Sequence, residues 1–375
     1  MKRIILIILI VLGLSSQSFA QKAPNYDKIF GTLAVDRSAI LRNNTQRHLD
    51  KNDIRGIADN LLAYQNPDGG WTKNIDWLDA TSPDTVLSHI EEDKRVSSFE
   101  NKNTTPQIEY LCAAYRITKD ERYSEAALRG LDYVYRSQHA NGGWRGIDVD
   151  AICFNDNLMG NMLNFLNKVS RGDEPFDWFV RKDKKRAAEA YKKALDVTLK
   201  CQVRTPDGKL AGWGQQHDNE TFLPCGGRSY ELPCIASNES SALVISLMAI
   251  PEPSKAIREA IEGCMAWLER SAIKGIRIET IELSDSMQAA THRKNDRRVV
   301  KDDSAPRIWA RCYETDTNTP FFCNRDGIKV YNLSEVSVER RAGYGWYGYW
   351  PEGTFHIFEA WKKGGVICRL LINNM

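Results

Sequence analysis

Apolar residues recur every three or four positions along most of the chain, a period typical of helices that bury one face. The first such run covers about 44–65. The next starts at Thr105-Pro106, where Thr suits the N-cap and Pro suits the first turn. Further helical runs are expected at about 121–137, from Asp156 onward, at 184–201, at 239–250 and at 254–270.

A turn sequence repeats between these runs. Gln-Asn-Pro-Asp-Gly-Gly-Trp at 65–71 returns as Gln-His-Ala-Asn-Gly-Gly-Trp at 138–144, and a looser copy spans 202–213. Pro-Asp-Gly and Asn-Gly favour tight turns, because Gly takes positive φ without strain and Asp or Asn bonds its own backbone. The Trp residues are 73 and then 69 residues apart, which leaves room for two helices and two loops per repeat.

We therefore expect repeated helix pairs with their turns at one end, stacked in a ring as an α/α toroid over about 41–280. The simpler alternative is that the Trp residues only plug helix ends.

The pattern of apolar and polar residues changes near the C-terminus. The charged stretch 281–305 is expected to be a surface insertion, and short strands are expected at 309–313, 321–323 and 328–331, before two closing helices. The predicted class is mainly α, with a smaller, partly β region at about 305–375.

The N-terminus has the pattern of a secretory signal peptide. Lys2 and Arg3 precede an apolar run from Ile4 to Leu14, and small residues end at Ala20. The apolar run is too short to span a bilayer. We expect a signal peptide at 1–20, a lead-in at 21–40 and one domain at 41–375, in a protein that is secreted or periplasmic after cleavage near Ala20.

The amino-acid composition limits the classes of partner that the protein is expected to bind. A net charge of +2 gives no general attraction to nucleic acid or to a membrane surface, and we expect a monomer. The ten Trp and fourteen Tyr suit a sugar-binding surface, although burial in the core is the usual alternative. The nine Cys contain no Cys-x-x-Cys pair, which argues against a zinc or thioredoxin-like site. The sequence alone does not decide whether pairs such as Cys225–Cys234 or Cys312–Cys323 form disulfide bonds.

The candidate chemistry lies in loops. The sequence has no His-Glu-x-x-His, no Gly-x-Ser-x-Gly and no Walker loop, so zinc hydrolase, serine esterase and nucleotide chemistry lack support. Three polar clusters remain, at 99–105, 153–157 and 225–233. Taken one at a time, the first two are explained by helix capping. Taken together, oxygen ligands beside arginines suit a hard cation that holds an anionic substrate.

Eight short segments carry a further signal when they are read together and in order: Gln65–Asn74, Glu100–Thr105, Arg116–Trp144, Asn155–Asn157, Gln215–Asp218, Arg228–Pro233, Trp309–Arg311 and Thr317–Phe321. They resemble the family-10 pectate lyases over nearly the whole mature chain. The resemblance implies an α/α toroid beside a smaller, partly β region, with a groove between them. It also implies calcium-dependent β-elimination of polygalacturonate.

The resemblance also implies roles for single residues. Arg228 matches the catalytic base, Asp156 matches a calcium-binding carboxylate, and Arg311 matches an arginine that binds the substrate carboxylate. Glu100 stands where the family usually has an Asp and is expected to bind the metal with Asn101. The remaining expected substrate-binding residues are Lys73, Asn155 and Tyr230.

The chemistry is consistent with these groups. Calcium and Arg bound to the uronate carboxylate would stabilise the enolate-like charge that develops when the C5 proton leaves. Two alternatives remain. An inverting glycoside hydrolase would need a carboxylate pair, such as Asp156 with Asp218 or Glu231. A carbohydrate-binding protein without activity would use the Trp turns to stack on sugars.

Overall fold

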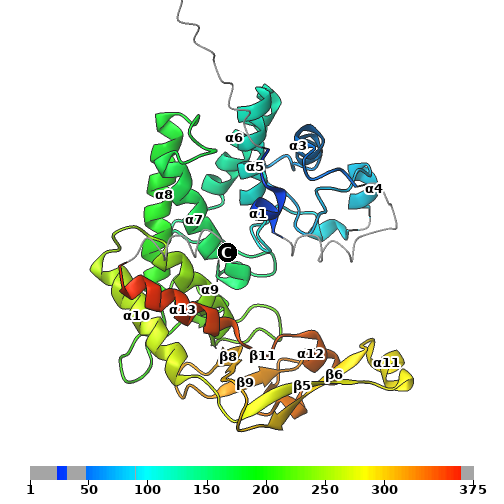
Figure 1. Ribbon diagram of the computed structural model, residues 1–375, viewed down its shortest axis with the longest axis vertical. Coiled ribbons are helices and arrows are strands. Elements are labelled where there is room, and N and C mark those ends of the chain that lie inside the picture. The colour runs from blue at the N-terminus through cyan, green and yellow to red at the C-terminus, as the bar shows by residue number, and fades with distance from the viewer. Residues whose placement is uncertain (1–22, 32–47, 89, 365–375) are drawn as a thin grey trace, which may run out of the picture.

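The computed structural model describes residues 23–31, 48–88 and 90–364 (Figure 1). The predicted signal peptide with its cleavage site, part of the lead-in and Cys368 lie outside these residues. Within the described ranges, no helix is long and apolar enough to cross a membrane. The eight cysteines that the structure describes are all free thiols.

Helices build most of the described chain before residue 271. They are α1 (Tyr26–Phe30), α3 (Ile54–Ala63), α4 (Pro83–Leu87), η1 (Glu92–Lys94), α5 (Thr105–Thr118), α6 (Glu121–Arg136), η2 (Asn155–Asn157), α7 (Leu158–Arg171), α8 (Arg181–Lys200), α9 (Ser237–Met248) and α10 (Lys255–Arg270). Side-chain caps fix several starts, because they satisfy backbone N–H groups that have no partner inside the helix. Asp53 accepts from the Gly56 N–H at 2.9 Å, and Ser254 accepts from the Ile257 N–H at 3.4 Å.

The three repeated Trp residues are fully buried at the ends of helix pairs. Each indole Nε1 donates to a carbonyl near the end of the preceding helix: Trp71 to Leu61 at 2.8 Å, Trp144 to Val134 at 2.9 Å and Trp213 to Thr198 at 2.7 Å. These indoles therefore plug helix ends, as the simpler alternative supposed. They also place the three turns equivalently on successive helix pairs.

The Gln that opens each repeat joins one pair to the next. Each side-chain Nε2 donates twice, once into its own turn and once to a helix of the following pair: Gln65 to Gly69 and Ala126, both at 2.9 Å, Gln138 to Gly142 and Ala190, both at 2.9 Å, and Gln202 to Ala211 and Ala260, both at 2.8 Å. The acceptor helices are α6, α8 and α10. The turns and the stacking of the pairs are thus fixed by the same side chains.

The predicted toroid is wrong. The pairs α5–α6, α7–α8 and α9–α10 pack side by side after α3, and α13 (Trp350–Lys362) packs on α9 at the end of the row. In Figure 1 the row is an open arc whose first and last helices lie apart. The structure is 45% helical and 14% strand, a mixture of helix and sheet. The ring does not close in the described ranges, because the chain leaves the helical row after α10 to build sheets.

Four small antiparallel sheets follow or interrupt the helices. Their strands are β1 (Ile152–Cys153), β2 (Gln216–His217) and β3 (Pro224–Cys225) in one sheet; β4 (Ile235–Ala236), β8 (Cys312–Tyr313), β9 (Pro320–Cys323) and β10 (Lys329–Val330) in a second; β7 (Trp309–Ala310) with β11 (Tyr347–Gly348); and β5 (Ile276–Glu282) with β6 (Asn295–Lys301). Of the strands predicted after residue 307, the first is divided into β7 and β8, the second is present as β9, and the third is shortened to β10. β1 pairs Ile152 with His217, and β2 pairs Gln216 with Cys225, so three distant loops meet at this sheet.

The last part of the chain has more regular structure than the sequence predicted. The charged stretch 281–305 lies mostly in the β5–β6 hairpin, which carries α11 (Asp285–Thr291) at its tip and projects from the body (Figure 1). Cross-strand pairs such as Arg298–Glu279 allow two charged strands to pair. The first of the two expected closing helices is instead two short pieces, η3 (Leu333–Glu335) and α12 (Val338–Gly343).

Candidate active site

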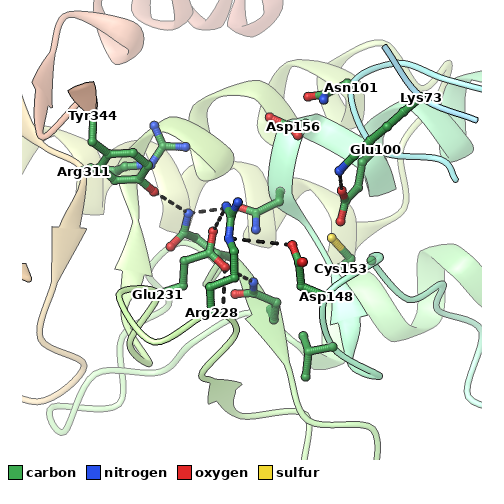
Figure 2. Close-up of a pocket in the computed structure, with 15 residues that line it drawn as sticks. Lys73, Glu100, Asn101, Asp148, Cys153, Asp156, Arg228, Glu231, Arg311 and Tyr344 are labelled. Carbon is green, nitrogen blue, oxygen red and sulfur yellow. Dashed lines mark hydrogen bonds and ion pairs between the residues drawn. The ribbon is translucent and has the colours of Figure 1, made fainter. Parts of the chain in front are cut away.

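A pocket of about 310 Å³ lies where the helical row meets the sheets (Figure 2). Its lining combines acidic, basic and amide side chains. Seven of the eight residues predicted from sequence line it: Lys73, Glu100, Asn101, Asn155, Asp156, Arg228 and Arg311. The eighth, Tyr230, does not line it but lies under Arg228, whose guanidinium carbon is 5.0 Å from the Tyr230 ring centre. Segments more than 200 residues apart in sequence therefore meet in one site.

The repeated turns deliver residues to this pocket. Five of the residues that line the pocket come two to four positions after one of the repeated Trp residues: Lys73 after Trp71, Gly146 and Asp148 after Trp144, and Gln215 and Gln216 after Trp213. The turns thus gather along one side of the pocket, as the repeat predicted. Sequence reasoning did not single out Asp148. Its signal was its place shortly after the second turn, four residues after Trp144.

Asp156 lies between β1 and α7 in a left-handed backbone conformation, with φ of 54°. A non-Gly residue in this region is strained, and such strain is commonest where a side chain must be aimed. Neighbouring Asn155 accepts a hydrogen bond from Gln215 Nε2 at 2.9 Å, which ties the loop to β2. Asn157, the N-cap residue of α7, makes no side-chain capping bond to that helix.

Glu100 is buried and uses both carboxylate oxygens. One accepts from the Ile147 N–H at 3.0 Å, and the other pairs with Lys73 Nζ. A Cβ on Gly146 would lie 2.4 Å from Glu100 Oε1, so glycine is needed there for the close approach. Glu100 therefore fixes the loop that carries Asp148 and holds Lys73 at the pocket wall.

Arg228 occupies a tight turn after β3 and makes ion pairs with two carboxylates. Its Nη2 donates to buried Glu231, and its Nε lies 3.7 Å from Asp148 Oδ2. Burial alone would lower the pKa of Arg228, but the hydrogen bond and charge of Glu231 outweigh it and raise that pKa above its ordinary value. Burial would raise the pKa of Glu231, but Arg228 and Gln216 hold it below its usual range.

Arg311 lies between β7 and β8, deeper than Arg228. Its Nη2 donates to Glu239 at 2.6 Å, and Glu239 is fully buried in the first turn of α9. The guanidinium stacks on Tyr344 at 4.8 Å, while the Tyr344 hydroxyl accepts from Gln215 Nε2 at 3.1 Å. Burial would lower the pKa of Arg311, but the Glu239 charge raises it above the ordinary value. Arg311 Nε is buried and has no hydrogen-bond partner within the described residues.

The donor chemistry suits a hard cation, but the grouping supplies only part of a calcium site. Calcium takes carboxylate and carbonyl oxygens, which Asp156 and Asn101 offer at the pocket wall. Glu100 is already paired with Lys73. Among the described residues there is no group of three or more His, Cys, Asp or Glu that would hold a metal by itself. A calcium ion would therefore need oxygens from the substrate or from water.

The carboxylates proposed for a hydrolase are not all in the pocket. Asp156 and Glu231 line it, whereas Asp218 does not. Asp218 Oδ1 accepts from the Thr221 N–H at 2.8 Å and from the Glu220 N–H at 3.1 Å, and these bonds hold the pKa of Asp218 below its usual range. Asp218 is therefore a turn-forming residue in this structure.

Comparison with known proteins gives two findings. A family model described as pectic acid lyase matches residues 65–355. Two solved structures of a family 10 polysaccharide lyase from Cellvibrio cellulosa are similar, each with 25% identity and a TM-score of 0.67. One, a mutant in complex with trigalacturonic acid, covers 90% of this chain and 99% of its own; the other covers 91% and 98%. No curated protein matches the chain.

Proposed function

The chain belongs to the pectic acid lyase family and is a polysaccharide lyase of the pectate lyase type, and from this premise we propose that it cleaves polygalacturonate by β-elimination with calcium as cofactor and Arg228 as base. The observation that carries the proposal is the meeting of Lys73, Arg228 and Arg311 with four carboxylates in one pocket. Each sugar of a polyuronate carries a carboxylate, so a protein that binds this polymer needs cationic side chains in its pocket.

Arg311 is proposed to bind the uronate carboxylate. Its guanidinium is held by Glu239 on one side and by the Tyr344 ring beneath it, so its orientation is fixed before substrate arrives. A planar guanidinium matches a carboxylate better than an ammonium does, because it offers parallel donors. Lys73 and Asn155, which line the pocket, are proposed to complete the substrate contacts, whereas Tyr230 supports Arg228 from outside it.

Asp156 is proposed to hold calcium, with the Asn101 carbonyl as a second oxygen. When bound, calcium would withdraw charge from the uronate carboxylate and so stabilise the enolate-like transition state. Glu100 acts beside this site by holding Lys73, so a direct role in metal binding would require it to release that lysine.

Arg228 is proposed to take the C5 proton. Only the neutral guanidine accepts a proton, and the pairing with Glu231 makes that form scarcer than in a free arginine. The rate should therefore rise with pH well past 8, by roughly tenfold per unit while the neutral fraction limits turnover. The electron pair of the C5–H bond forms the C4–C5 double bond, and the C4 oxygen leaves with the pair of the broken C4–O bond and takes a proton from solvent. The products are an unsaturated chain end and a free hydroxyl, with no net addition of water.

The direct test is incubation with polygalacturonate, with and without calcium, monitored by the absorbance of the 4,5-unsaturated product. Arg228→Ala should lose about 10²–10⁴-fold in rate while still binding oligogalacturonate with calcium. Arg277→Ala, in a paired arginine of the β5–β6 hairpin, is the matched control and should keep full rate. Near-normal turnover by Arg228→Ala would refute the base assignment. Reducing ends without unsaturated product would indicate a hydrolase.

Secretion is proposed from the N-terminal pattern. Expression of the full chain in a bacterium should give a mature protein that begins at Gln21, as measured by intact mass and N-terminal sequencing. Light scattering of that product should report a monomer. A product that retains Met1 in the cytoplasmic fraction would contradict the signal peptide.

A further inference from the structure

Arg340, in α12, is a buried arginine behind the active site. Its side chain belongs to a residue that is only 5% exposed. Three aromatic rings enclose it, with their centres 4.0 Å (Tyr230), 4.4 Å (Tyr344) and 5.7 Å (Trp346) from the guanidinium carbon. None of the roles argued above uses it.

Its guanidinium forms no ion pair with a carboxylate in the part of the chain that the structure describes, although the charge of the adjacent Glu339 acts on it. The Nε and Nη2 atoms are buried without a hydrogen-bond partner. Its neighbour Arg341 is the opposite case, because it pairs with Asp296 at 2.6 Å. A buried cation without a partner costs stability, and aromatic faces offset only part of that cost. The stability of the fold alone therefore does not explain an arginine at position 340.

Two of the three rings around Arg340 also support the two pocket arginines. Tyr230 has Arg228 at 5.0 Å from its centre, and Tyr344 has Arg311 at 4.8 Å. The two rings meet edge to face, with centres 6.3 Å apart. The five groups thus form a series of cation, ring, cation, ring and cation, with Arg340 in the centre.

The geometry points to a positioning role: we propose that Arg340 holds Tyr230 and Tyr344, and through them Arg228 and Arg311, at the separation that the uronate requires. Arg340 does not line the pocket and touches no reacting atom. This inference rests on the proposed function, because it takes Arg228 and Arg311 as the base and the carboxylate-binding residue. A displacement of about 1 Å at either group can cost on the order of 10²-fold in rate.

The test replaces Arg340 by Met, which fills similar space without charge or planarity. Arg340→Met should lower kcat/KM on trigalacturonate by about 10–100-fold, with the larger share in kcat. Its Tm should be unchanged or higher, because an apolar side chain replaces an unpaired buried charge. Arg341→Met is the matched control. It should lower Tm, since Asp296 loses its partner, and should keep the wild-type kcat.

Two further variants keep the test decisive. Arg340→Lys retains the charge but not the planar stack, so it should also lose most of its kcat. Arg340→Ala should regain part of its kcat on addition of non-denaturing guanidinium, but not of methylammonium. Wild-type kcat in Arg340→Met or Arg340→Lys would overturn the proposal, as would a loss in Arg340→Ala that guanidinium does not relieve. Arg228→Ala, measured in parallel, distinguishes failure of the Arg340 proposal from failure of the proposed function. Full activity of Arg228→Ala refutes the assignment of Arg228 as the base, whatever the Arg340 variants show.

Discussion

Acid should destabilise this protein through one histidine. His217 in β2 is fully buried beside Phe154, and both of its ring nitrogens are used. Nε2 accepts from the Gly214 N–H at 2.8 Å, and Nδ1 donates to the Phe222 carbonyl at 2.7 Å. This pattern requires a neutral ring, since a protonated Nε2 has no acceptor for its proton. Burial lowers the pKa of His217 from 6.5 to about 4.

The magnitude follows from linkage. Below pH 6.5 the unfolded chain binds a proton at this histidine, whereas the folded chain does not until about pH 4. The stabilisation is complete above pH 6.5 and is lost as pH falls toward 4. A shift of about 2.5 units corresponds to about 3 kcal/mol in total, of which about 2 kcal/mol is lost between pH 7 and pH 5.

The assay is urea unfolding at pH 7, 6 and 5, followed by circular dichroism. His217→Gln should be less stable than wild type at pH 7 but should lack most of the decline toward pH 5. His356→Gln, at an exposed position of α13, should keep the wild-type decline. Equal wild-type stability at pH 7 and pH 5, or the same decline in His217→Gln, would refute the reasoning. Gln216, next in β2, lines the pocket, so the site should loosen over the same pH range.

Three further outcomes are expected. Arg311→Lys keeps a charge beside Glu239 but loses the planar guanidinium, so kcat/KM on polygalacturonate should fall at least about tenfold with Tm preserved; an unfolded variant would make Arg311 structural. Chelation should abolish activity, calcium rather than zinc should restore it, and Asp156→Asn should raise the calcium concentration for half-maximal rate; an unchanged titration would refute the ligand assignment. Gln138→Ala removes two hydrogen bonds and should cost about 2–3 kcal/mol in urea unfolding; a change below about 0.5 kcal/mol would show that this Gln does not join the pairs.

Local signals in the sequence predicted most helices well, but the first, expected over about 44–65, is shorter, because residues 48–53 are not helical and α3 begins at Ile54. The period of apolar residues marked α5 to α10, and Thr105-Pro106 marked the start of α5 within a residue. The closure of the row was not predictable, because it depends on how many pairs stack and where the last one lies, which no local pattern encodes. The toroid was therefore the wrong extension of a correct repeat.

The candidate active site was also predicted only in part from the sequence. Motif positions brought Asp156, Arg228 and Arg311 to one pocket, as expected. Their partners were harder to foresee. Glu239 meets Arg311 from a helix 72 residues earlier, and Tyr344 joins from the far end of the chain. Such contacts depend on tertiary packing, and neither residue lies in a motif with a turn or cap signature.

The glutamine that opens each repeat has a consequence for protein engineering. Because its side chain bonds both its own turn and a helix of the following pair, a turn and its pocket residue do not form an independent cassette. The acceptor at Ala126 is a backbone carbonyl, so a loop exchanged between homologous enzymes keeps this bond only where α6 holds the same position relative to the incoming turn. The smallest transferable unit therefore runs from Gln65 through Ala126, and recombination points placed inside it should give misaligned chimeras.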